Sequence, residues 1–147
     1  MTQPASLPFG QCLATLFNEK GVLDLTPDMQ LASGRNVLAQ SLVRRQFTPR
    51  GSVITSPNDC IDIRQLISQA MTDAQVAAIG QVIRTELVRD QRVLDAQVTV
   101  VLSANKTVAT VTENVQSAQG PFTLTITLPG PVVNGQTPNI SVVISGQ

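Results

Sequence analysis

The chain has 147 residues, and its ten basic and ten acidic side chains give a formal net charge of zero. It lacks histidine, tryptophan and tyrosine, so the commonest metal ligand and most side chains that stack on bases or sugars are missing. There is no long charged run and no apolar run long enough to span a bilayer, which argues against a nucleic-acid tail and a membrane span. We expect one domain with its own core.

Residues 1–20 are predicted to form an N-terminal arm that includes a short helix. Two prolines and a glycine favour an extended chain over 1–10, and Leu13, Leu16 and Phe17 give 11–19 a helical spacing. The start has neither a basic n-region nor an apolar h-region, so we expect no secretory signal. Two interpretations of the apolar arm stay open: it packs on a neighbouring subunit, or it folds back on its own core.

The next segment alternates short apolar runs with turn residues. Residues 22–25 predict a strand or an extended lead-in, and Thr26-Pro27-Asp28 predicts a turn. Apolar residues at helical spacing then predict a helix over 34–46 that ends in two arginines. The sequence Thr48-Pro49-Arg50-Gly51 breaks that helix, because proline cannot continue it and glycine tolerates a left-handed turn.

Two further helices are predicted over 62–71 and 73–89. The first has Asp62 or Asp59 as its cap and an apolar face that repeats with helical periodicity. Thr72 and Gln75 form a capping box, which indicates that a new helix starts there. A single apolar stripe follows along this helix: Val76, Ile79, Ile83 and Leu87.

From residue 93 the apolar period changes to two, which is typical of half-buried strands. Strands are predicted over 93–102, 107–115 and 121–128, with a last short one at 140–144. One face of the first strand is predicted to carry Leu94, Ala96, Val98, Val100 and Leu102. The resulting α+β class has an N-terminal arm and three helices packed on a C-terminal antiparallel sheet of three to four strands.

The order SGRNVLAQSLVRR, TPRGS, loop and DIRQLIS resembles the small baseplate wedge protein of contractile phage tails. That lysozyme-like wedge family is shared with type VI secretion systems and contractile bacteriocins. The match covers residues 24 to 102, so the chain divides into the arm (1–20), a wedge-type α+β core (21–115) and a C-terminal β extension of the same domain (116–147).

The resemblance implies a structural subunit of a baseplate wedge, without catalytic residues, metal or cofactor. Its partners would be larger wedge proteins acting as a dimer, a central hub or spike, and tail sheath subunits. Six copies per baseplate are implied, in a virion tail assembled in the host cytoplasm, with no membrane or nucleic-acid partner.

A Glu-Pro-Arg signature of that family corresponds here to Asp90, Gln91 and Arg92. The acid is one methylene shorter, and the proline that would lock the turn is absent. The predicted partner-binding residues are Asp90, Gln91, Arg92, Arg89, Arg44, Arg45 and Arg50. The alternative is an internal surface pair, either Asp90 with Arg92 or Arg89 with Asp90, worth under about 1 kcal/mol.

Two other functions compete with the wedge subunit. Arg35, Arg44, Arg45, Arg50 and Arg64 are candidates for one basic patch of a nucleic-acid-binding accessory protein. A lysozyme-type hydrolase would need a protonated carboxyl beside a second one. We expect Arg89 to lie near Glu86 on one helix face, where it stabilises the ionised acid and opposes general-acid catalysis.

The two cysteines cannot by themselves form a metal site. Cys12 and Cys60 are predicted to be reduced, buried thiols, with a disulfide between them as the alternative.

Overall fold

The computed structural model describes residues 9–17, 23–70, 72–131 and 140–146, and it confirms the α+β class. The helices in these residues are α1 (Arg35–Gln46), α2 (Ile63–Ser68) and α3 (Asp73–Val88). The strands are β1 (Gln11–Leu13), β2 (Thr15–Phe17), β3 (Leu23–Leu25), β4 (Leu31–Ser33), β5 (Val93–Leu102), β6 (Val108–Ser117), β7 (Gly120–Pro129) and β8 (Ser141–Ser145).

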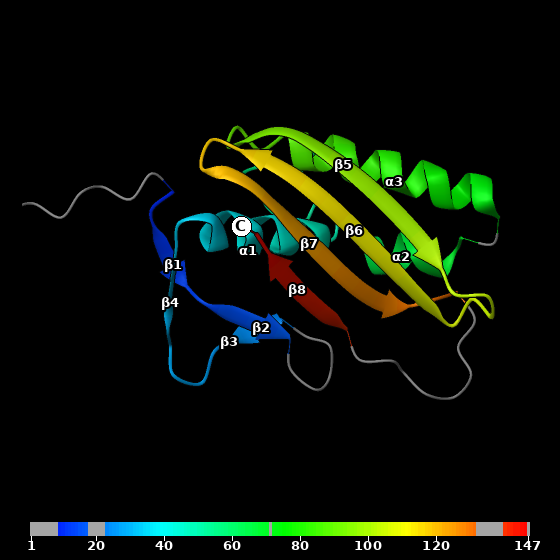
Figure 1. Ribbon diagram of the computed structural model, residues 1–147, viewed down its shortest axis with the longest axis horizontal. Helices are drawn as coiled ribbons and strands as arrows, with labels where there is room; N and C mark the ends of the chain where they lie inside the picture. Colours follow the sequence, from blue (N-terminus) through cyan, green and yellow to red (C-terminus); the bar gives the residue numbers. More distant parts are fainter. Residues whose placement is uncertain (1–8, 18–22, 71, 132–139, 147) are drawn as a thin grey trace, which may run out of the picture.

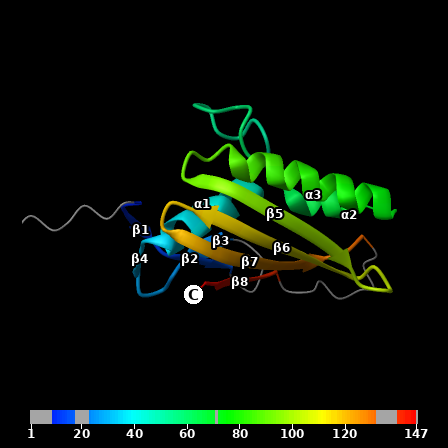
Figure 2. The same cartoon turned by 45° about the horizontal axis from the view of Figure 1, so that its top comes forward.

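A four-stranded antiparallel sheet in the order β5-β6-β7-β8 organises the fold. The helices lie on one face of this sheet (Figure 1 and Figure 2). The buried apolar side chains of the two central strands are Ala109, Val111, Val115, Phe122, Leu124, Ile126 and Leu128. They share one core with helix residues that include Leu38, Leu42, Ile63, Ile67, Ile83 and Leu87. Burial of this shared core fixes the helices on the sheet.

All three helices begin within one residue of the predicted position, and side-chain caps fix the start of two of them, α2 and α3. The Asp62 carboxylate accepts the Arg64 N–H at 3.1 Å and caps α2. Thr72 and Gln75 form the predicted capping box at the start of α3, with the Gln75 N–H bonded to Thr72 Oγ1 at 3.3 Å. Helix α2 ends at Ser68, short of the predicted residue 71, which lies outside the described residues.

The N-terminal segment differs from its prediction. The expected helix over 11–19 is wrong in the described part, where β1 pairs with β4 and β2 pairs with β3 in two small antiparallel sheets. The predicted strand at 22–25 is confirmed as β3, and the Met29 N–H closes the predicted turn on the Thr26 carbonyl at 2.9 Å. Phe9 packs against the core, so this end of the described arm folds back on the chain.

The predicted turn after α1 opens a long loop. The Ser52 N–H bonds to the Pro49 carbonyl at 3.1 Å, and Gly51 takes a φ of 86°, which glycine adopts without strain. The connection between α1 and α2, residues 48–61, then projects from the body of the molecule (Figure 2). We call residues 48–61 the α1–α2 loop.

Strand β5 has the predicted alternation except at its start. A register shift between Val93 and Asp95 places Leu94 outside the core, where it is 68% exposed, so its predicted inward position is wrong. Such a bulge adds one residue to a strand and reverses the alternation on one side of it.

Helix α3 packs along β5 at the edge of the sheet. The Arg84 side chain donates to the Ala96 carbonyl at 2.8 Å and forms an ion pair with Asp95 at 3.2 Å. A Cβ atom at Gly80 would lie 3.6 Å from the Val98 carbonyl, so the helix backbone passes close to this strand. The glycine inside the helix therefore permits the close packing that its position in the sequence indicates.

The C-terminal strands continue one sheet without interruption. The division at 115/116 between the wedge-type core and the predicted C-terminal extension of the same domain falls inside β6, and the segment beyond it forms the rest of β6 with β7 and β8. The last strand runs from Ser141 to Ser145, as predicted to within one residue. The loop expected over 132–138 lies outside the described residues.

Both cysteines are free thiols. Cys60 is buried, as expected, and desolvation by burial raises the pKa of its thiol. Cys12 is only half-buried, with its Sγ atom 3.7 Å from a guanidinium nitrogen of Arg44.

Candidate functional site

A buried carboxylate joins the end of α3 to the end of α1. Glu86 is only 2% exposed, and its Oε1 accepts the Arg45 guanidinium at 2.7 Å. The same oxygen accepts the backbone N–H of Cys60 at 2.8 Å. Arg89, one turn further along α3, lies 3.5 Å from Oε2, which is the neighbour that the sequence indicated for Glu86. Through these charge-assisted hydrogen bonds the Glu86 carboxylate connects the ends of the two helices.

The same group of charges fastens the α1–α2 loop. Arg89 donates to the Asn58 carbonyl at 2.8 Å, and Arg50 donates to the Cys60 carbonyl at 3.4 Å. Asp59 lies 3.6 Å from Arg89 and 3.8 Å from Arg45. We call Glu86, Arg45, Arg50, Asp59, Arg89 and the Cys60 N–H the Glu86 network. Its contacts explain how Cys60 is held at a φ of 74°, which is unfavourable for a residue with a side chain.

The helix-to-strand junction forms a type I β-turn. The Val93 N–H bonds to the Asp90 carbonyl at 2.9 Å, and neither Gln91 nor Arg92 has a positive φ, which excludes the other common turn types. The Asp90 carboxylate also accepts the Arg92 N–H at 3.0 Å. Hydrogen bonds therefore close this turn without the proline of the family signature.

Arg92 is held as a rigid fork in this turn. Its Nε and Nη2 atoms bind the two carboxylate oxygens of Asp90 at 2.9 and 2.7 Å, and Nη2 also reaches Ser41 Oγ at 2.9 Å. The hydrogen bonds from Arg92 hold the pKa of the Asp90 carboxyl below its usual value. The pair is internal and largely buried on the Asp90 side, while the Arg92 side chain stays 31% exposed.

Replacing Gln91 by proline should stabilise the fold by about 0.4–1 kcal/mol. Gln91 is exposed and occupies the second position of the turn, where proline fits the required φ of about −60°. Urea unfolding of Gln91→Pro beside the wild type measures the effect. A loss of stability would mean that the junction is not the turn described above.

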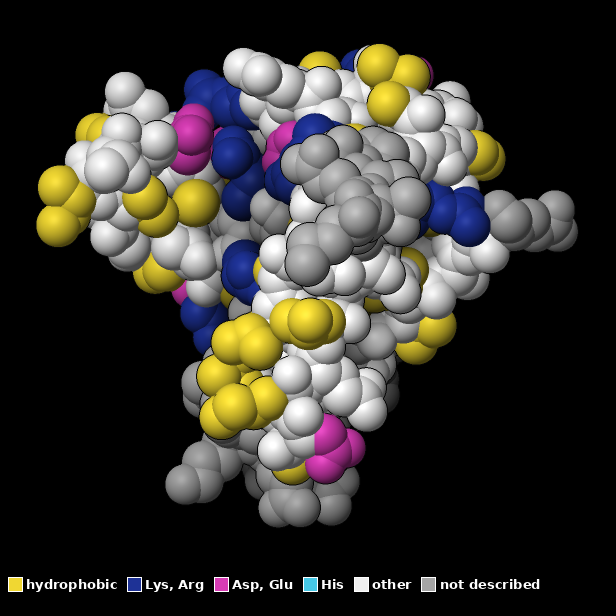
Figure 3. Space-filling view, turned by 90° about the vertical axis from the view of Figure 1, so that its left-hand side faces the viewer, with side chains coloured by type: hydrophobic (Ala, Val, Ile, Leu, Met, Phe, Trp, Pro, Cys, Tyr) yellow, Lys and Arg dark blue, Asp and Glu magenta, His cyan; other side chains and the backbone are white. Residues whose placement is uncertain are grey.

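The structure brings together most, but not all, of the predicted partner-binding residues. Arg45, Arg50 and Arg89 meet in the Glu86 network, and Asp90 and Arg92 pair beside it. Arg44 points elsewhere and donates to the Leu13 carbonyl at 3.4 Å. On the left-hand side of the molecule, Lys and Arg side chains gather with acidic ones among them in a hollow of the surface (Figure 3).

The remaining residues of the basic stretch also have intramolecular partners. Arg35 donates to the Pro121 carbonyl at 3.0 Å, and Arg64 binds the Asp62 carboxylate at 2.9 Å and stacks over Phe47. A nucleic-acid site needs cations directed at phosphates. Here each arginine of the proposed basic patch forms a hydrogen bond or ion pair within the chain. The structure therefore offers no observation in favour of a nucleic-acid-binding protein.

Glu113 is a second buried carboxyl, and sequence reasoning missed its role. It is 0% exposed in the centre of the sheet, and the Gln46 amide donates to its Oε2 at 3.0 Å. Burial raises the pKa of Glu113 to about 8, and the Gln46 hydrogen bond offsets only part of that effect. Glu113 Oε1 and Gln46 Oε1 are both buried and have no hydrogen-bond partner among the described residues.

Neither glutamate is placed as a hydrolase would require. Glu86 is surrounded by arginines, and Glu113 lies within the core away from the surface. Retaining and inverting glycosidases instead place two carboxyls across an open cleft.

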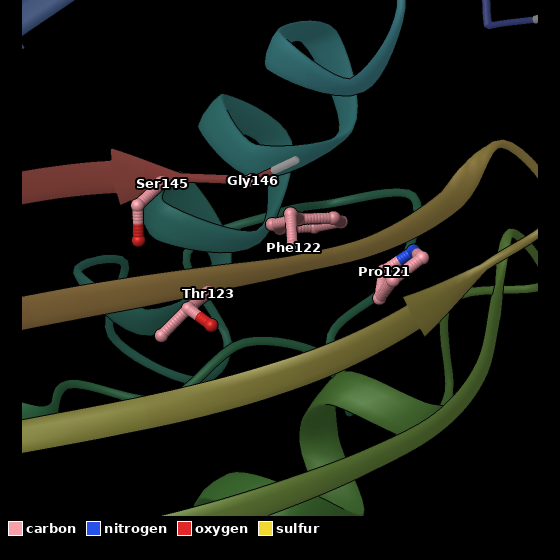
Figure 4. A pocket seen from close by; sticks show the side chains of 5 residues that line it. All are labelled: Pro121, Phe122, Thr123, Ser145 and Gly146. Atoms are coloured by element: carbon pink, nitrogen blue, oxygen red, sulfur yellow. The ribbon is translucent and has the colours of Figure 1, made fainter.

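The surface of the described residues has hollows, of which two are large enough to consider. One, of about 500 Å³, is lined by Pro121, Phe122, Thr123, Ser145 and Gly146, where β7 begins and β8 ends (Figure 4). The other, of about 370 Å³, lies between the turn at Pro49 and helices α2 and α3, with Ile61, Leu66 and Val82 in its lining. The first lining has no charged side chain, and the second also contains Arg50 and Asp62.

In the part of the chain that the structure describes, no cluster of histidine, cysteine or acidic residues is arranged to hold a metal ion. No helix there has the length and apolar character needed to cross a membrane. No protein-family model matches the chain, and no curated protein matches its sequence.

Proposed function

We propose that the protein is a structural, non-enzymatic subunit of a contractile-tail baseplate wedge. In this proposal it binds larger wedge proteins, contacts the first ring of sheath subunits, and occurs in six copies around a central hub or spike. The virion tail baseplate would be its location, after assembly in the host cytoplasm.

The observation that supports this proposal is the closed turn at Asp90, Gln91 and Arg92. In the family that the sequence resembles, the Glu-Pro-Arg signature lies where a helix ends and a strand begins. Arg92 has that position, and its fork is oriented by Asp90 on one side and by Ser41 of α1 on the other. A guanidinium held in place loses little entropy when its exposed edge binds a carboxylate or the carbonyls of a partner helix end.

The other residues that carry the resemblance support the same surface. The Arg-Arg pair at the end of α1 supplies Arg45, which binds Glu86 beside Arg89, one position before the turn. The α1–α2 loop is fastened to the same place through Cys60 and Asn58. A wedge partner docked there would contact elements that are rigidly connected to the sheet, as mechanical coupling to the sheath requires.

Arg92→Ala should abolish co-purification of the subunit with the larger wedge proteins of the same tail. Removal of the fork would leave the partner group desolvated and unpaired, at a cost of about 2–5 kcal/mol at the interface. It also leaves the Asp90 carboxylate without its guanidinium, so the free subunit should lose about 1–3 kcal/mol of stability. Co-purification in the cold, with circular dichroism to verify folding, measures both effects.

Ser41→Ala is the matched control, because it removes one internal contact of Arg92 while the two hydrogen bonds to Asp90 still orient the fork and leave its exposed edge intact. This variant should lose about 1 kcal/mol of stability and still assemble. Gln91→Pro should assemble like the wild type. The yield of co-purified complex can be compared with the free energy of unfolding for Arg92→Ala, Ser41→Ala and Gln91→Pro. If the loss of complex is proportional to the loss of stability in all three, Arg92 is an internal structural residue only and the proposed contact is wrong.

A further inference from the structure

Two of the predicted partner-binding arginines, Arg44 and Arg92, lie where α1 faces the N-terminal strands. Arg92 reaches α1 through its 2.9 Å hydrogen bond to Ser41, and Arg44 lies three residues further along that helix. Residues three apart share one face of a helix. The strands β1 to β4 lie beside α1 (Figure 1 and Figure 2). The two guanidinium groups are therefore neighbours on the face of α1 that carries Ser41.

The described start of the chain contacts both arginines. The Arg92 guanidinium lies over the Phe9 ring, with its Cζ atom 6.0 Å from the ring centroid. Arg44 donates to the Leu13 carbonyl at 3.4 Å and lies 3.7 Å from the Cys12 Sγ atom. One short segment at the beginning of the chain thus covers part of each guanidinium group.

This segment supplies no negative charge to the arginines. We call residues 9–13 the cover segment, and it contains no acidic residue. Within the part of the chain that the structure describes, Arg44 has no carboxylate oxygen within 4.0 Å. Arg92 pairs with Asp90, and its side chain is 31% exposed. One carboxylate therefore serves two guanidinium groups, and the charge of Arg44 is not neutralised.

A carboxylate from outside the chain would bind Arg44 better than the cover segment does. It adds a negative charge that a backbone carbonyl lacks, and guanidinium–carboxylate pairs frequently form two parallel hydrogen bonds. The 3.4 Å contact of Arg44 with Leu13 is long for a hydrogen bond to oxygen, in contrast to the 2.7 Å contact of Arg45 with Glu86. The contact with Leu13 is therefore one that a carboxylate can replace.

We propose that Arg44 and Arg92 form a binding site for the carboxylates of an acidic segment of a partner protein, and that the cover segment is displaced when this partner binds. Asp90 and Ser41 keep Arg92 oriented during the exchange, since neither belongs to the cover segment. The formal net charge of zero and the lack of a basic run favour a local acidic segment over a nucleic acid as the ligand. This inference rests on the proposed function and deepens it, because it identifies the chemistry of the wedge partner and what controls access to Arg92.

The reactivity of Cys12 reports whether the cover segment is displaced. Alkylation by iodoacetamide, followed by mass spectrometry of the peptides, measures Cys12 and the buried Cys60 separately in one sample. A hexaglutamate peptide at low ionic strength should raise the alkylation rate of Cys12 severalfold, while hexaglutamine should leave it unchanged. Phe9→Ala should raise this rate without any peptide, because the cover segment loses its contacts with Arg92 and the core. The rate at Cys60 should stay low throughout, because only unfolding exposes that thiol.

Fluorescence anisotropy of labelled hexaglutamate measures the site itself. Phe9→Ala should bind the peptide severalfold more tightly than the wild type, because the peptide no longer competes with an anchored cover segment. Arg44→Ala should bind it about tenfold more weakly, the effect of removing one hydrogen bond to a charged group. The matched control is Arg84→Ala, which removes an arginine of α3 that pairs with Asp95 and should bind like the wild type.

Three results would overturn the proposal. The first is failure of hexaglutamate to bind either the wild type or Phe9→Ala, and the second is binding that leaves the alkylation of Cys12 unchanged. The third is weaker binding by Phe9→Ala, which would make Phe9 part of the site instead of its cover. A single-stranded oligonucleotide that binds more tightly than hexaglutamate would replace the acidic protein segment by a nucleic acid, and would also overturn it.

Circular dichroism verifies that the variants are folded. If Phe9→Ala does not fold, Phe9→Leu keeps the apolar packing, loses the ring over Arg92 and provides the same comparison. These measurements use the free subunit, so their outcome is separate from co-purification with the larger wedge proteins. A subunit that binds hexaglutamate and never binds wedge proteins would contradict the proposed function alone.

Discussion

Replacing Glu86 by alanine should lower the free energy of unfolding by about 3–5 kcal/mol, the range for breaking a buried ion pair. The change leaves Arg45 without its 2.7 Å partner and the buried Cys60 N–H without an acceptor. The α1–α2 loop should also loosen, because Cys60 is one of its attachment points. Urea unfolding measures the first effect, and limited proteolysis within residues 48–61 measures the second.

Asp59→Ala is the matched control within the Glu86 network. Its carboxylate lies 3.6 to 3.8 Å from the same arginines, but its side chain is 36% exposed. It should therefore cost less than about 1 kcal/mol. Glu86→Gln should fall between the two, since an amide oxygen still accepts from Cys60 but carries no charge. Equal losses for Glu86→Ala and Asp59→Ala would contradict the central position of Glu86.

Glu113→Gln should make the protein more stable at neutral and alkaline pH. The native pKa of about 8 exceeds the ordinary value of 4.5, so the native state binds more protons than the unfolded state between these two values. The stabilisation from the protonated carboxyl is fully present below pH 4.5 and is lost as the pH rises through 8. Each pH unit in this window costs the wild type about 1.4 kcal/mol.

The hydrogen bonding between residue 113 and Gln46 explains why glutamine suits position 113. A second amide donates to Gln46 Oε1 and accepts from Gln46 Nε2, so both buried oxygens gain partners at every pH. Protonated glutamic acid does the same, since its O–H supplies the donor that Gln46 Oε1 otherwise lacks.

Urea unfolding at pH 5, 7 and 9 tests this prediction. The difference in free energy of unfolding between Glu113→Gln and the wild type should grow by several kcal/mol across the series. Gln81→Ala, a change at an exposed site without a titratable group, should leave the pH dependence of the wild type unaltered. A difference that stays constant with pH would show that Glu113 ionises in the native state as it does in water.

The parts of the fold that the sequence predicted well are those fixed by local signals. The capping box at Thr72 sets the start of α3, and alternating apolar residues set β6 and β7. The prediction for the N-terminal segment failed because three apolar residues in a short segment fit the period of a helix as well as that of a strand. The pairing of the N-terminal strands depends on β3 and β4, which local sequence does not reveal.

The candidate site was only partly visible in the sequence. Arg89 next to Glu86 follows from helical spacing, but Arg45 and the Cys60 N–H come from distant parts of the chain. The sequence did contain a signal for the buried pair of Gln46 and Glu113. Gln46 interrupts the apolar face of α1, and Glu113 replaces an apolar residue between Val111 and Val115. Two polar residues at core positions of different elements indicate that they meet.

The packing of α3 along β5 also determines how the sheet can grow. A sheet edge with open backbone groups recruits further strands, and a fibril needs two such edges so that each added chain offers a new one. Arg84 occupies the outward carbonyl of Ala96, and the helix lies against β5 around Gly80. If the β8 edges of two chains paired, both outer edges of the combined sheet would be covered β5 strands, so no third chain could add. Because helix α3 covers the β5 edge, edge-to-edge assembly of the sheet stops at two chains and cannot continue into a fibril.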